Sequence, residues 1–228
     1  MRDAEPGTFE AGGGRLVSRL LLVPDGARIL YVLAHGAGVG MEHRAMEEVA
    51  WGLAGRGMAS FRYNFPYMEQ GGKRPDPPAL CHAVVRAAVA EAGRLAPGLP
   101  LVAGGRSFGG RMTSQAQALA PLPAVLGLIF LAFPLHPAGQ PGRERAKHLF
   151  DVQVPMLFLQ GTRDALADVT LLRPLCAELG GRATLETFED ADHSFKLPAR
   201  SGRTNAEVLD DVLDRLAAWA AALVDLRR

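Results

Sequence analysis

Short, almost unbroken apolar runs place the strongest limit on the fold of this 228-residue chain. They lie at residues 29–34, 101–103, 125–132 and 156–159. A strand of this composition is covered on both faces, as strands inside a parallel sheet are. Weaker strand patterns, which include polar residues, lie at 16–23, 59–63 and 183–188. These runs together predict a largely parallel central sheet.

Segments with a helical spacing of apolar residues separate most of these runs, at 44–54, 78–95, 108–119, 169–179 and 204–223. The alternation predicts an α/β fold in three layers, with a mostly parallel sheet of about seven or eight strands between helices. The turn Pro24-Asp25-Gly26 predicts a hairpin, and hence an antiparallel edge. Residues 134–151 are expected to form a long loop or a short helix, so residues 1–228 are expected to be one domain without a substantial lid.

Charge and cysteine content argue against several classes of protein. A formal net charge of +1 provides no field that would attract nucleic acid or an anionic membrane. The most apolar stretch, 124–135, is shorter than the ~20 residues that cross a bilayer, and the N-terminus lacks the apolar segment of a signal peptide. Cys81 and Cys176 cannot form a disulfide framework, so a cytoplasmic protein is expected. No metal-ligand cluster or nucleotide-binding motif occurs in the sequence, so neither a cofactor nor a metal is expected.

The glycine-rich segment after residues 101–103 carries the strongest chemical signal. Gly105, Ser107 and Gly109 form the pattern G-x-S-x-G between a predicted strand and the predicted helix at 108–119. In this context the serine stands on a tight strand-to-helix turn, and its small neighbours let other segments approach closely. The pattern predicts a nucleophilic serine at position 107.

A serine hydroxyl needs a base to take its proton and an acid to orient that base. Asp164 follows the strand predicted at 156–159, and His193 follows the strand predicted at 183–188. Both therefore lie at carboxyl ends of strands, where the catalytic groups of open α/β sheets gather. The order Ser107, Asp164, His193 is the one expected for this type of turn.

Three other aspartates are alternatives for the acid. Asp168 is the main one, although its place near the start of the helix predicted at 169–179 favours a capping role. Asp190 and Asp192 are poorer candidates, because they share a short loop with His193 and would shape its turn.

A fourth element follows the strand predicted at 29–34, namely His35-Gly36-Ala37-Gly38. Acyl transfer creates an oxyanion that two backbone N–H groups must meet, one from the residue after the nucleophile and one from this early loop. Phe108 and Ala37 are the predicted donors, with Gly38 as the alternative to Ala37. We interpret His35 as an imidazole that braces the loop.

Four residues around these elements are candidates for a substrate pocket. Gly38, Phe65 and Tyr67 follow strand ends and could line it, as could Tyr63, although aromatic residues there serve as often as core packing. Arg106, like Arg111, flanks the nucleophile and could attract a carboxylate-bearing substrate. Pairing with a nearby acid is the common alternative role for such an arginine.

Together, the loop 35–38, the Ser107 turn, Asp164 and His193 resemble the α/β-hydrolase superfamily over about residues 16–223. Within it the chain resembles the compact, lidless branch of dienelactone-hydrolase-like proteins. It resembles more closely the hydrolase-like domains related to testis-expressed protein 30 and to a subunit of the NSL chromatin complex. The matching stretches are HGAG, RYNFPY at 62–67, GGRSFGGRM, and LFLQGTRD at 157–164. Dienelactone hydrolase has cysteine where this chain has Ser107, so its substrate is not carried over.

The resulting hypothesis is a serine hydrolase of the carboxylesterase type that acts on a small-molecule acyl substrate. It is expected to be a monomer or a homodimer. A thioesterase or peptidase with the same three residues is an alternative within the same chemistry. A non-catalytic binding or scaffold module is an alternative of a different class, because a fold does not dictate function. The short connections at the strand ends predict a thinly covered site and a preference for short acyl chains.

Overall fold

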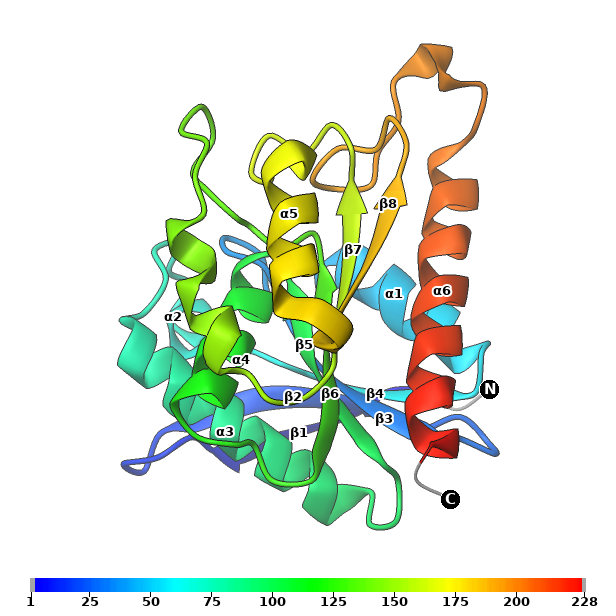
Figure 1. Cartoon of the computed structure of the whole chain (residues 1–228). Coiled ribbons are helices and arrows are strands. Elements are labelled where there is room, and N and C mark those ends of the chain that lie inside the picture. Colours follow the sequence, from blue (N-terminus) through cyan, green and yellow to red (C-terminus); the bar gives the residue numbers. More distant parts are fainter. Residues whose placement is uncertain (1–2, 227–228) are drawn as a thin grey trace.

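The computed structural model describes residues 3–226, which form an eight-stranded sheet with helices on both faces (Figure 1). The order of strands across the sheet is β1-β2-β4-β3-β5-β6-β7-β8. Their bounds are β1 Glu5–Glu10, β2 Leu16–Leu22, β3 Ile29–Ala34, β4 Met58–Tyr63, β5 Leu101–Arg106, β6 Val125–Leu131, β7 Met156–Gly161 and β8 Ala183–Phe188. The strands from β4 to β8 in this order are parallel, and β1 and β2 form an antiparallel edge. The predicted fold class is confirmed.

The antiparallel edge is built from strands other than those predicted. The turn at Pro24-Asp25-Gly26 does not close a hairpin, because β4 lies between β2 and β3 in the sheet. Instead β2 pairs with β1, with Phe9 opposite Val17. The sequence did not indicate β1, because only Phe9 of its six residues is buried. The local turn signal therefore predicted β3 as the partner of β2, which is wrong.

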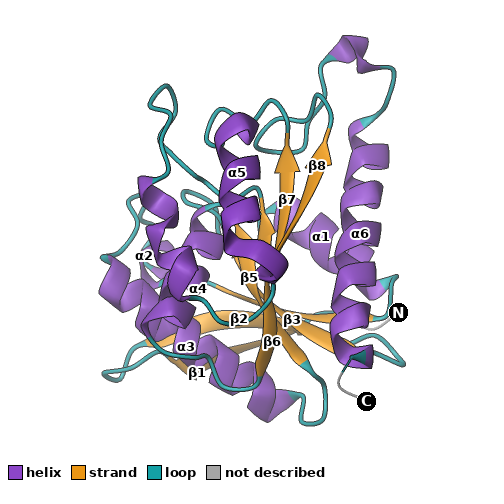
Figure 2. Cartoon of the chain, viewed as in Figure 1, coloured by secondary structure: helices purple, strands orange, loops and turns teal. Residues whose placement is uncertain are grey.

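Side chains of the central strands alternate between two cores. In β3, Leu30 and Val32 belong to the larger core, which includes residues of α3, α4 and α5. Tyr31 and Leu33 belong to the second core, which includes residues of α1 and α6. Because side chains along a strand point alternately to its two faces, an unbroken apolar run supplies both cores. Figure 2 shows the resulting layers, with helices on either side of the sheet.

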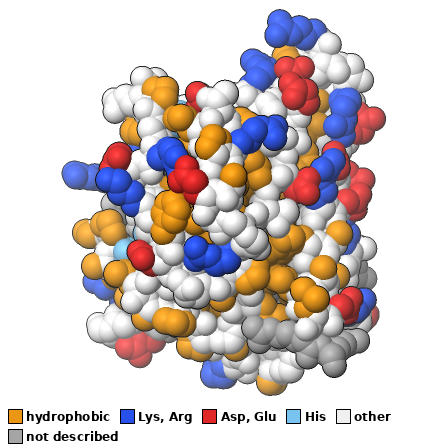
Figure 3. Space-filling model, viewed as in Figure 1, with side chains coloured by type: hydrophobic (Ala, Val, Ile, Leu, Met, Phe, Trp, Pro, Cys, Tyr) orange, Lys and Arg blue, Asp and Glu red, His pale blue; other side chains and the backbone are white. Residues whose placement is uncertain are grey.

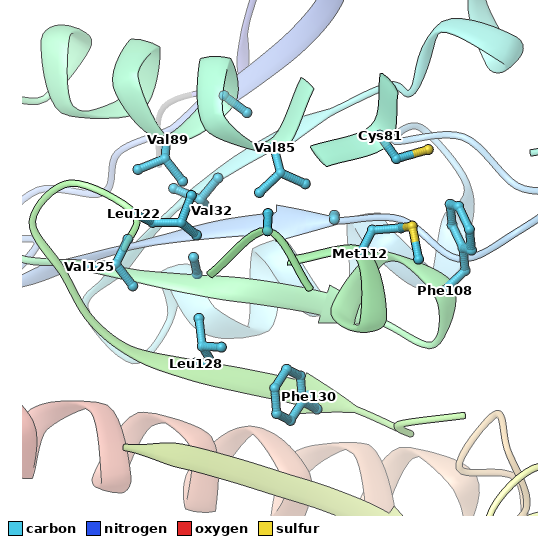
Figure 4. Packing of buried hydrophobic residues seen from close by; sticks show 14 of the residues in the cluster. Val32, Cys81, Val85, Val89, Phe108, Met112, Leu122, Val125, Leu128 and Phe130 are labelled. Atoms are coloured by element: carbon cyan, nitrogen blue, oxygen red, sulfur yellow. The ribbon is translucent and has the colours of Figure 1, made fainter. Parts of the chain in front are cut away.

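The larger core is closed by the packing of α3 and α4 on the sheet. Figure 4 shows Val85 and Val89 of α3 directed toward the sheet that contains Val32 of β3, with Met112 of α4 farther along the same layer next to Phe108. The three valines and Met112 are at most 2% exposed. Burial of a branched or unbranched aliphatic side chain contributes about 1.5–3 kcal/mol, so this layer anchors the helix that begins at the candidate nucleophile.

The main helices are α1 Arg44–Ala54, α3 Pro78–Leu95, α4 Phe108–Leu119, α5 Val169–Leu179 and α6 Asn205–Asp225. The predicted bounds of the first four agree with the structure. Helix α6 begins after Thr204, which forms a capping box with Glu207: each side chain accepts a hydrogen bond from the other residue's backbone N–H. Local capping and apolar spacing specify these helices, which is why the sequence predicted them well.

Only short segments cover the carboxyl ends of the strands. The connection from β6 to β7 contains the 3₁₀ helix Glu144–Asp151, and α2 Pro66–Glu69 follows β4. The expectation of a fold without a substantial lid is thus confirmed. Within residues 3–226, none of the helices has the length and apolarity required to cross a bilayer. Acidic and basic side chains are interspersed on the face shown in Figure 3.

Candidate active site

Ser107 lies in the sharp turn between β5 and α4. Its φ of 48° and ψ of −114° are sparsely populated by residues with a side chain, and such backbone strain is typical of a nucleophile turn. The Ser107 N–H donates to the Leu131 carbonyl at the end of β6, at 2.9 Å, which helps to hold this conformation. The turn directs the serine side chain toward the carboxyl ends of the neighbouring strands.

The two outer glycines of the motif allow close backbone contacts. A Cβ at Gly105 would lie 2.3 Å from the Ala34 carbonyl oxygen of β3, and the φ of Gly105 is +152°. A Cβ at Gly109 would lie 2.5 Å from the carbonyl oxygen of His35. No side chain can occupy such positions, so both glycines are required where β5 and α4 pass the end of β3.

The structure brings the three predicted residues together from three strand ends. The Nε2 atom of His193 lies 2.8 Å from the Ser107 Oγ atom, although the residues are 86 positions apart. The Nδ1 atom of His193 lies 2.6 Å from an Asp164 carboxylate oxygen. An ionised carboxylate only accepts hydrogen bonds, so Nδ1 carries the proton and Nε2 presents its lone pair to the serine.

Asp164 is held rigidly in a buried position. Its side chain is 0% exposed, whereas that of His193 is 25% exposed. One carboxylate oxygen accepts from the Leu166 N–H at 2.7 Å, and the oxygen that meets His193 also accepts from the side-chain amide of Gln160. These bonds orient the carboxylate toward the imidazole and satisfy its acceptors.

Sequence reasoning did not single out Gln160. It is fully buried, and it is the polar residue that interrupts the apolar run of β7. A polar side chain at that point in a buried strand needs a hydrogen-bond partner, and this need could have identified Gln160 as a residue of the candidate site.

The other aspartates have different surroundings. Asp168 caps α5: its carboxylate accepts from the Thr170 N–H at 2.8 Å, as predicted for a capping residue. Asp192 accepts from the backbone N–H groups of Ser194 and Lys196, and so shapes the loop that carries His193. Asp190 has a positive φ of 58° in the same loop.

The early loop lies directly beside the serine. A Cβ at Gly36 would stand 3.9 Å from the Ser107 Cβ atom. Ala37 and Gly38, next in this loop, are exposed. Phe108 is the first residue of α4, where backbone N–H groups have no carbonyl partner within the helix. The two predicted N–H donors thus belong to segments that meet at Ser107.

His35 braces this loop from behind, in agreement with its predicted structural role. It is fully buried, its Nε2 accepts from the Phe65 N–H at 3.0 Å, and its Nδ1 lies 2.8 Å from the Gly36 carbonyl oxygen. An Nε2 acceptor requires the proton on Nδ1, which therefore donates to Gly36. Burial lowers the pKa of His35 to about 4, so the ring is neutral at neutral pH.

Two of the predicted pocket residues are core residues. Phe65 is 0% and Tyr67 3% exposed, and both rings contact His35, with centroid distances of 5.1 and 5.9 Å. Burial raises the pKa of Tyr67 to about 12. These aromatic side chains therefore support the loop from the interior and do not form an open pocket wall. Gly38 remains at the surface, and Arg106 lines a groove.

This α1/α6 groove has a volume of about 1090 Å³, and its lining does not include Ser107, Asp164 or His193. Arg106 of β5 and Leu131 of β6 line it, together with Ser194 and Phe195 from the loop after β8. The side walls are formed by residues 43–56 at α1 and 205–213 of α6. The sequence analysis did not anticipate it, because it depends on how two helices distant in the chain approach one another.

The residues that the structure describes include no group of three or more His, Cys, Asp or Glu side chains placed to hold a metal ion. The polar groups around Ser107 are a base, a carboxylate and backbone N–H groups. A base within hydrogen-bond distance of a serine hydroxyl is chemically able to take its proton.

Comparison with known families agrees with the fold. A family model described as an α/β-hydrolase domain matches residues 27–221. The chain therefore belongs to the α/β-hydrolase family, and the resemblance noted from its motifs is confirmed at that level.

Solved structures with the same fold include enzymes of this class. A serine hydrolase without a lid from Xanthomonas campestris is 20% identical, with a TM-score of 0.73 and 96% of each chain covered. A dienelactone hydrolase from Anabaena variabilis is 19% identical, with a TM-score of 0.74 and coverage of 96% of this chain and 97% of that chain. The esterase domain of a Rhodothermus marinus protein is 16% identical, with a TM-score of 0.72 and coverage of 96% and 98%. At these identities the likeness concerns the fold.

Proposed function

We propose that this hydrolase cleaves a carboxylic ester or a related acyl bond, with Ser107 as nucleophile, His193 as base and Asp164 as the acid that orients it. The observation that carries the proposal is the continuous hydrogen-bonded arrangement of the three side chains, at 2.8 Å and 2.6 Å. The presence of an esterase domain among the similar folds supports the same reaction class.

In the first half of the reaction the Ser107 Oγ attacks the carbonyl carbon while His193 Nε2 takes its proton. The negative charge that develops on the carbonyl oxygen is met by the N–H groups of Ala37 and Phe108. The tetrahedral intermediate then collapses: the bond to the leaving oxygen breaks, and His193 gives its proton to the departing alcohol. The acyl group is left on the serine.

In the second half a water molecule takes the place of the alcohol. His193 removes a proton from the water as its oxygen attacks the acyl-enzyme, and the same N–H groups stabilise the second oxyanion. Collapse of this intermediate releases the carboxylic acid and returns the proton to Ser107. Throughout, Asp164 keeps the imidazole in the required tautomer and stabilises the transient imidazolium.

A fluorophosphonate probe tests the assignment of the nucleophile, because it modifies serines that are activated by a base. We expect labelling of the wild-type protein at Ser107, mapped by peptide mass spectrometry, and no labelling of Ser107→Ala. Labelling that persists at another serine in Ser107→Ala would overturn the proposal.

The length of the acyl chain tests how much of a neutral substrate the site encloses. The short connections around the strand ends leave a long chain partly in water, and each exposed CH₂ forgoes about 0.8 kcal/mol of binding. We expect p-nitrophenyl esters from acetate to butyrate to have a higher kcat/KM than long-chain esters. A steady rise toward long chains would contradict this expectation.

A further inference from the structure

Strand β8 is the last strand of the sheet and pairs on one side only, with β7 (Figure 1). Phe188 shows which of its backbone groups face β7, because the Phe188 carbonyl accepts from the Thr162 N–H just beyond β7, at 3.0 Å. Backbone groups of successive residues in a strand point alternately to its two edges. Those of Ala183, Leu185 and Thr187 therefore point to the outer edge.

Most of these outward backbone groups have no partner. The Ala183 N–H donates to the Gly180 carbonyl of the preceding 3₁₀ turn. Within the described part of the chain, neither the Ala183 carbonyl nor the backbone groups of Leu185 and Thr187 form a hydrogen bond. Residues 183–187 are all partly exposed, although α5 and α6 contact β8. The edge is therefore accessible to another strand.

The two edges of the sheet differ in how they oppose pairing. At the other edge, β1 contains Pro6, which has no N–H to offer, and ends at the exposed Glu10. β8 contains neither proline nor lysine, and its one charged residue, Glu186, is paired with Arg215 of α6. An unprotected edge strand is a template for pairing with another chain. β8 is such a strand, and β1 is not.

Opposite charges stand at the two ends of β8. Arg182 precedes the strand and donates only to the carbonyls of Phe150 and Val152, so no acid neutralises it within residues 3–226. Glu189 follows the strand, is exposed, and forms no ion pair with these residues. Antiparallel pairing of two β8 strands would bring each Arg182 to the end that carries Glu189 of the other copy. Parallel pairing would bring like charges together.

We propose that two copies of this chain form a dimer through antiparallel pairing of their β8 strands, with Leu185 of both copies at the two-fold axis. The Leu185 N–H then donates to the Leu185 carbonyl of the second copy, and the Thr187 N–H donates to the Ala183 carbonyl of the second copy. Symmetry repeats both bonds, so the outward donors of β8 are satisfied. The two sheets become one continuous sheet. The inference is independent of the reaction proposed for Ser107.

Charge and hydrogen bonding select this register over its neighbours. With Leu185 at the axis, Glu186 lies opposite Thr184 of the second copy. A shift that puts Glu186 at the axis would place two carboxylates opposite each other, which is destabilising. The opposite shift, with Thr184 at the axis, moves Thr187 past the end of the partner strand, so its N–H loses the acceptor.

Apolar packing beside the edge favours the same arrangement. A hollow of about 370 Å³ between α5 and β8 is lined by Ala183 and Leu185 and by the small residues Ala177 and Gly180 of α5 and its end. Directly opposite residues of an antiparallel pair have their side chains on the same face of the sheet. Leu185 of the second copy would therefore enter this side of the sheet and contact its counterpart.

Cysteine cross-linking tests the register. In Leu185→Cys the two thiols belong to directly opposite residues, whose Cα atoms are about 5.5 Å apart in such a pair, within the range of a disulfide. Thr187→Cys is the matched control on the same edge, because its two copies would lie about 14 Å apart. Both are combined with Cys176→Ala, because Cys176 lines the hollow.

Mild oxidation should convert Leu185→Cys, and not Thr187→Cys, into a disulfide-linked dimer on a non-reducing gel. Absence of the linked dimer in Leu185→Cys would overturn the inference. Equal linkage of the two variants would do so as well, because it would show random collision.

Two variants should weaken the dimer by different means. Leu185→Asp places two carboxylates opposite each other and removes apolar contact, and Thr187→Pro removes an N–H that the monomer does not use. Each should raise the dissociation constant by about 10- to 100-fold in sedimentation equilibrium. Thr8→Asp adds the same charge to an exposed position of β1 and should leave the constant unchanged. Circular dichroism shows whether each variant is folded, and either folded variant is a sufficient test.

A wild-type protein that remains monomeric, or a dimer that Thr8→Asp weakens as much as Leu185→Asp does, would overturn the inference. Hydrogen exchange distinguishes a second copy from another occupant of the edge. The N–H groups of Leu185 and Thr187 should exchange more slowly as the concentration of the pure protein rises. Protection that appears only when a different protein is added would assign the edge to that protein and overturn the inference.

Discussion

The two ends of the parallel strands are built in different ways. Before β3, β4 and β5, positive φ angles are taken by glycines with open space around them, namely Gly26, Gly57 and Gly98. After β5, β6 and β8, residues with side chains take such angles, namely Ser107, Ala132, Asp190 and Phe195. The contrast has exceptions within residues 3–226: Ala124 is a non-glycine with positive φ before β6, and Gly38 and Gly139 have positive φ in the loops after β3 and β6.

This difference shows where the fold accepts strain. A residue with a Cβ in the left-handed region costs about 1–2 kcal/mol, which glycine avoids. Glycines at the amino ends only have to turn the chain. At the carboxyl ends, Ser107 has to carry a hydroxyl, and the loop with Asp190 and Phe195 has to carry His193 into contact with it. The backbone conformations that lower stability therefore lie around the candidate active site.

The largest expected effect comes from removing the hydroxyl at the most strained position. Ser107→Ala and Ser107→Gly should each lower turnover by about 10⁴–10⁶, as for residues that act as a unit. Ser107→Gly should also be more stable than Ser107→Ala by about 1 kcal/mol, because glycine tolerates the φ of 48°. Ester hydrolysis and urea unfolding measure the two quantities. A glycine variant less stable than the alanine variant would mean that the turn is not strained.

Two aspartates at the same edge should separate activity from stability. Asp164→Asn should lower turnover by about 10⁴, because an amide does not hold the imidazole in the required tautomer. Asp168→Ala should leave turnover near that of wild type and lower the free energy of unfolding by about 1 kcal/mol, because α5 loses its cap. Wild-type activity in Asp164→Asn would assign the acid to another residue.

Acid should destabilise the fold through buried histidines, whether or not they lie near the nucleophile. Burial lowers the pKa of both His35 and His148 to about 4. An unfolded histidine has a pKa of about 6.5, so below that pH the unfolded chain binds protons that the folded chain does not. Their contribution to stability is therefore complete above pH ~6.5 and is lost progressively as the pH falls toward ~4.

His148→Gln isolates one of these two contributions. Its side chain meets Ser114 on α4 at 2.7 Å, away from the three candidate catalytic residues. As the pH falls from ~6 to ~4.5, the free energy of unfolding of the variant should decrease by about 1.4 kcal/mol less per pH unit than that of wild type. Urea unfolding at several pH values provides the measurement. Equal pH dependence in the two proteins would show that His148 has the same pKa in the folded and the unfolded state.

Two substitutions, one at each end of the parallel strands, should have the smallest effects on stability, and these effects should be of opposite sign. Asp190→Gly removes a Cβ at a φ of 58° and should stabilise the protein by about 0.5 kcal/mol. Gly57→Ala adds a Cβ at a φ of +71°, where nothing lies within 4 Å, and should destabilise it by about 1 kcal/mol. Thermal unfolding of both variants tests the comparison directly. Changes of the same sign would contradict it.

Local signals explain how much of this fold was predictable. The bounds of α1, α3, α4 and α5 followed from apolar spacing and end signals, which act within a few residues. The pairing of β2 did not follow, because it depends on β4, whose residues lie about 40 positions later in the chain. Strand β1 was missed because its one buried residue, Phe9, leaves no pattern.

The same division holds for the candidate site. Ser107, Asp164 and His193 stand in positions defined by strand ends, so topology and motif order were enough to bring them together. The α1/α6 groove that Arg106 lines could not be predicted, because it depends on how two helices distant in the chain approach one another. The burial of Phe65 and Tyr67 was equally inaccessible, because alternation after a strand end does not say which side chains face the interior.

The separation of 86 residues between Ser107 and His193 has a consequence for the growing chain. During synthesis at about 5–20 residues per second, the serine turn emerges roughly 4–17 s before the histidine. Throughout that interval the hydroxyl has no base and is as unreactive as any other serine. Under the roles proposed for Ser107 and His193, a nascent or truncated chain that stops before β8 would not react with acyl compounds around it, and labelling of Ser107 would report that β8 and the loop with His193 have been delivered.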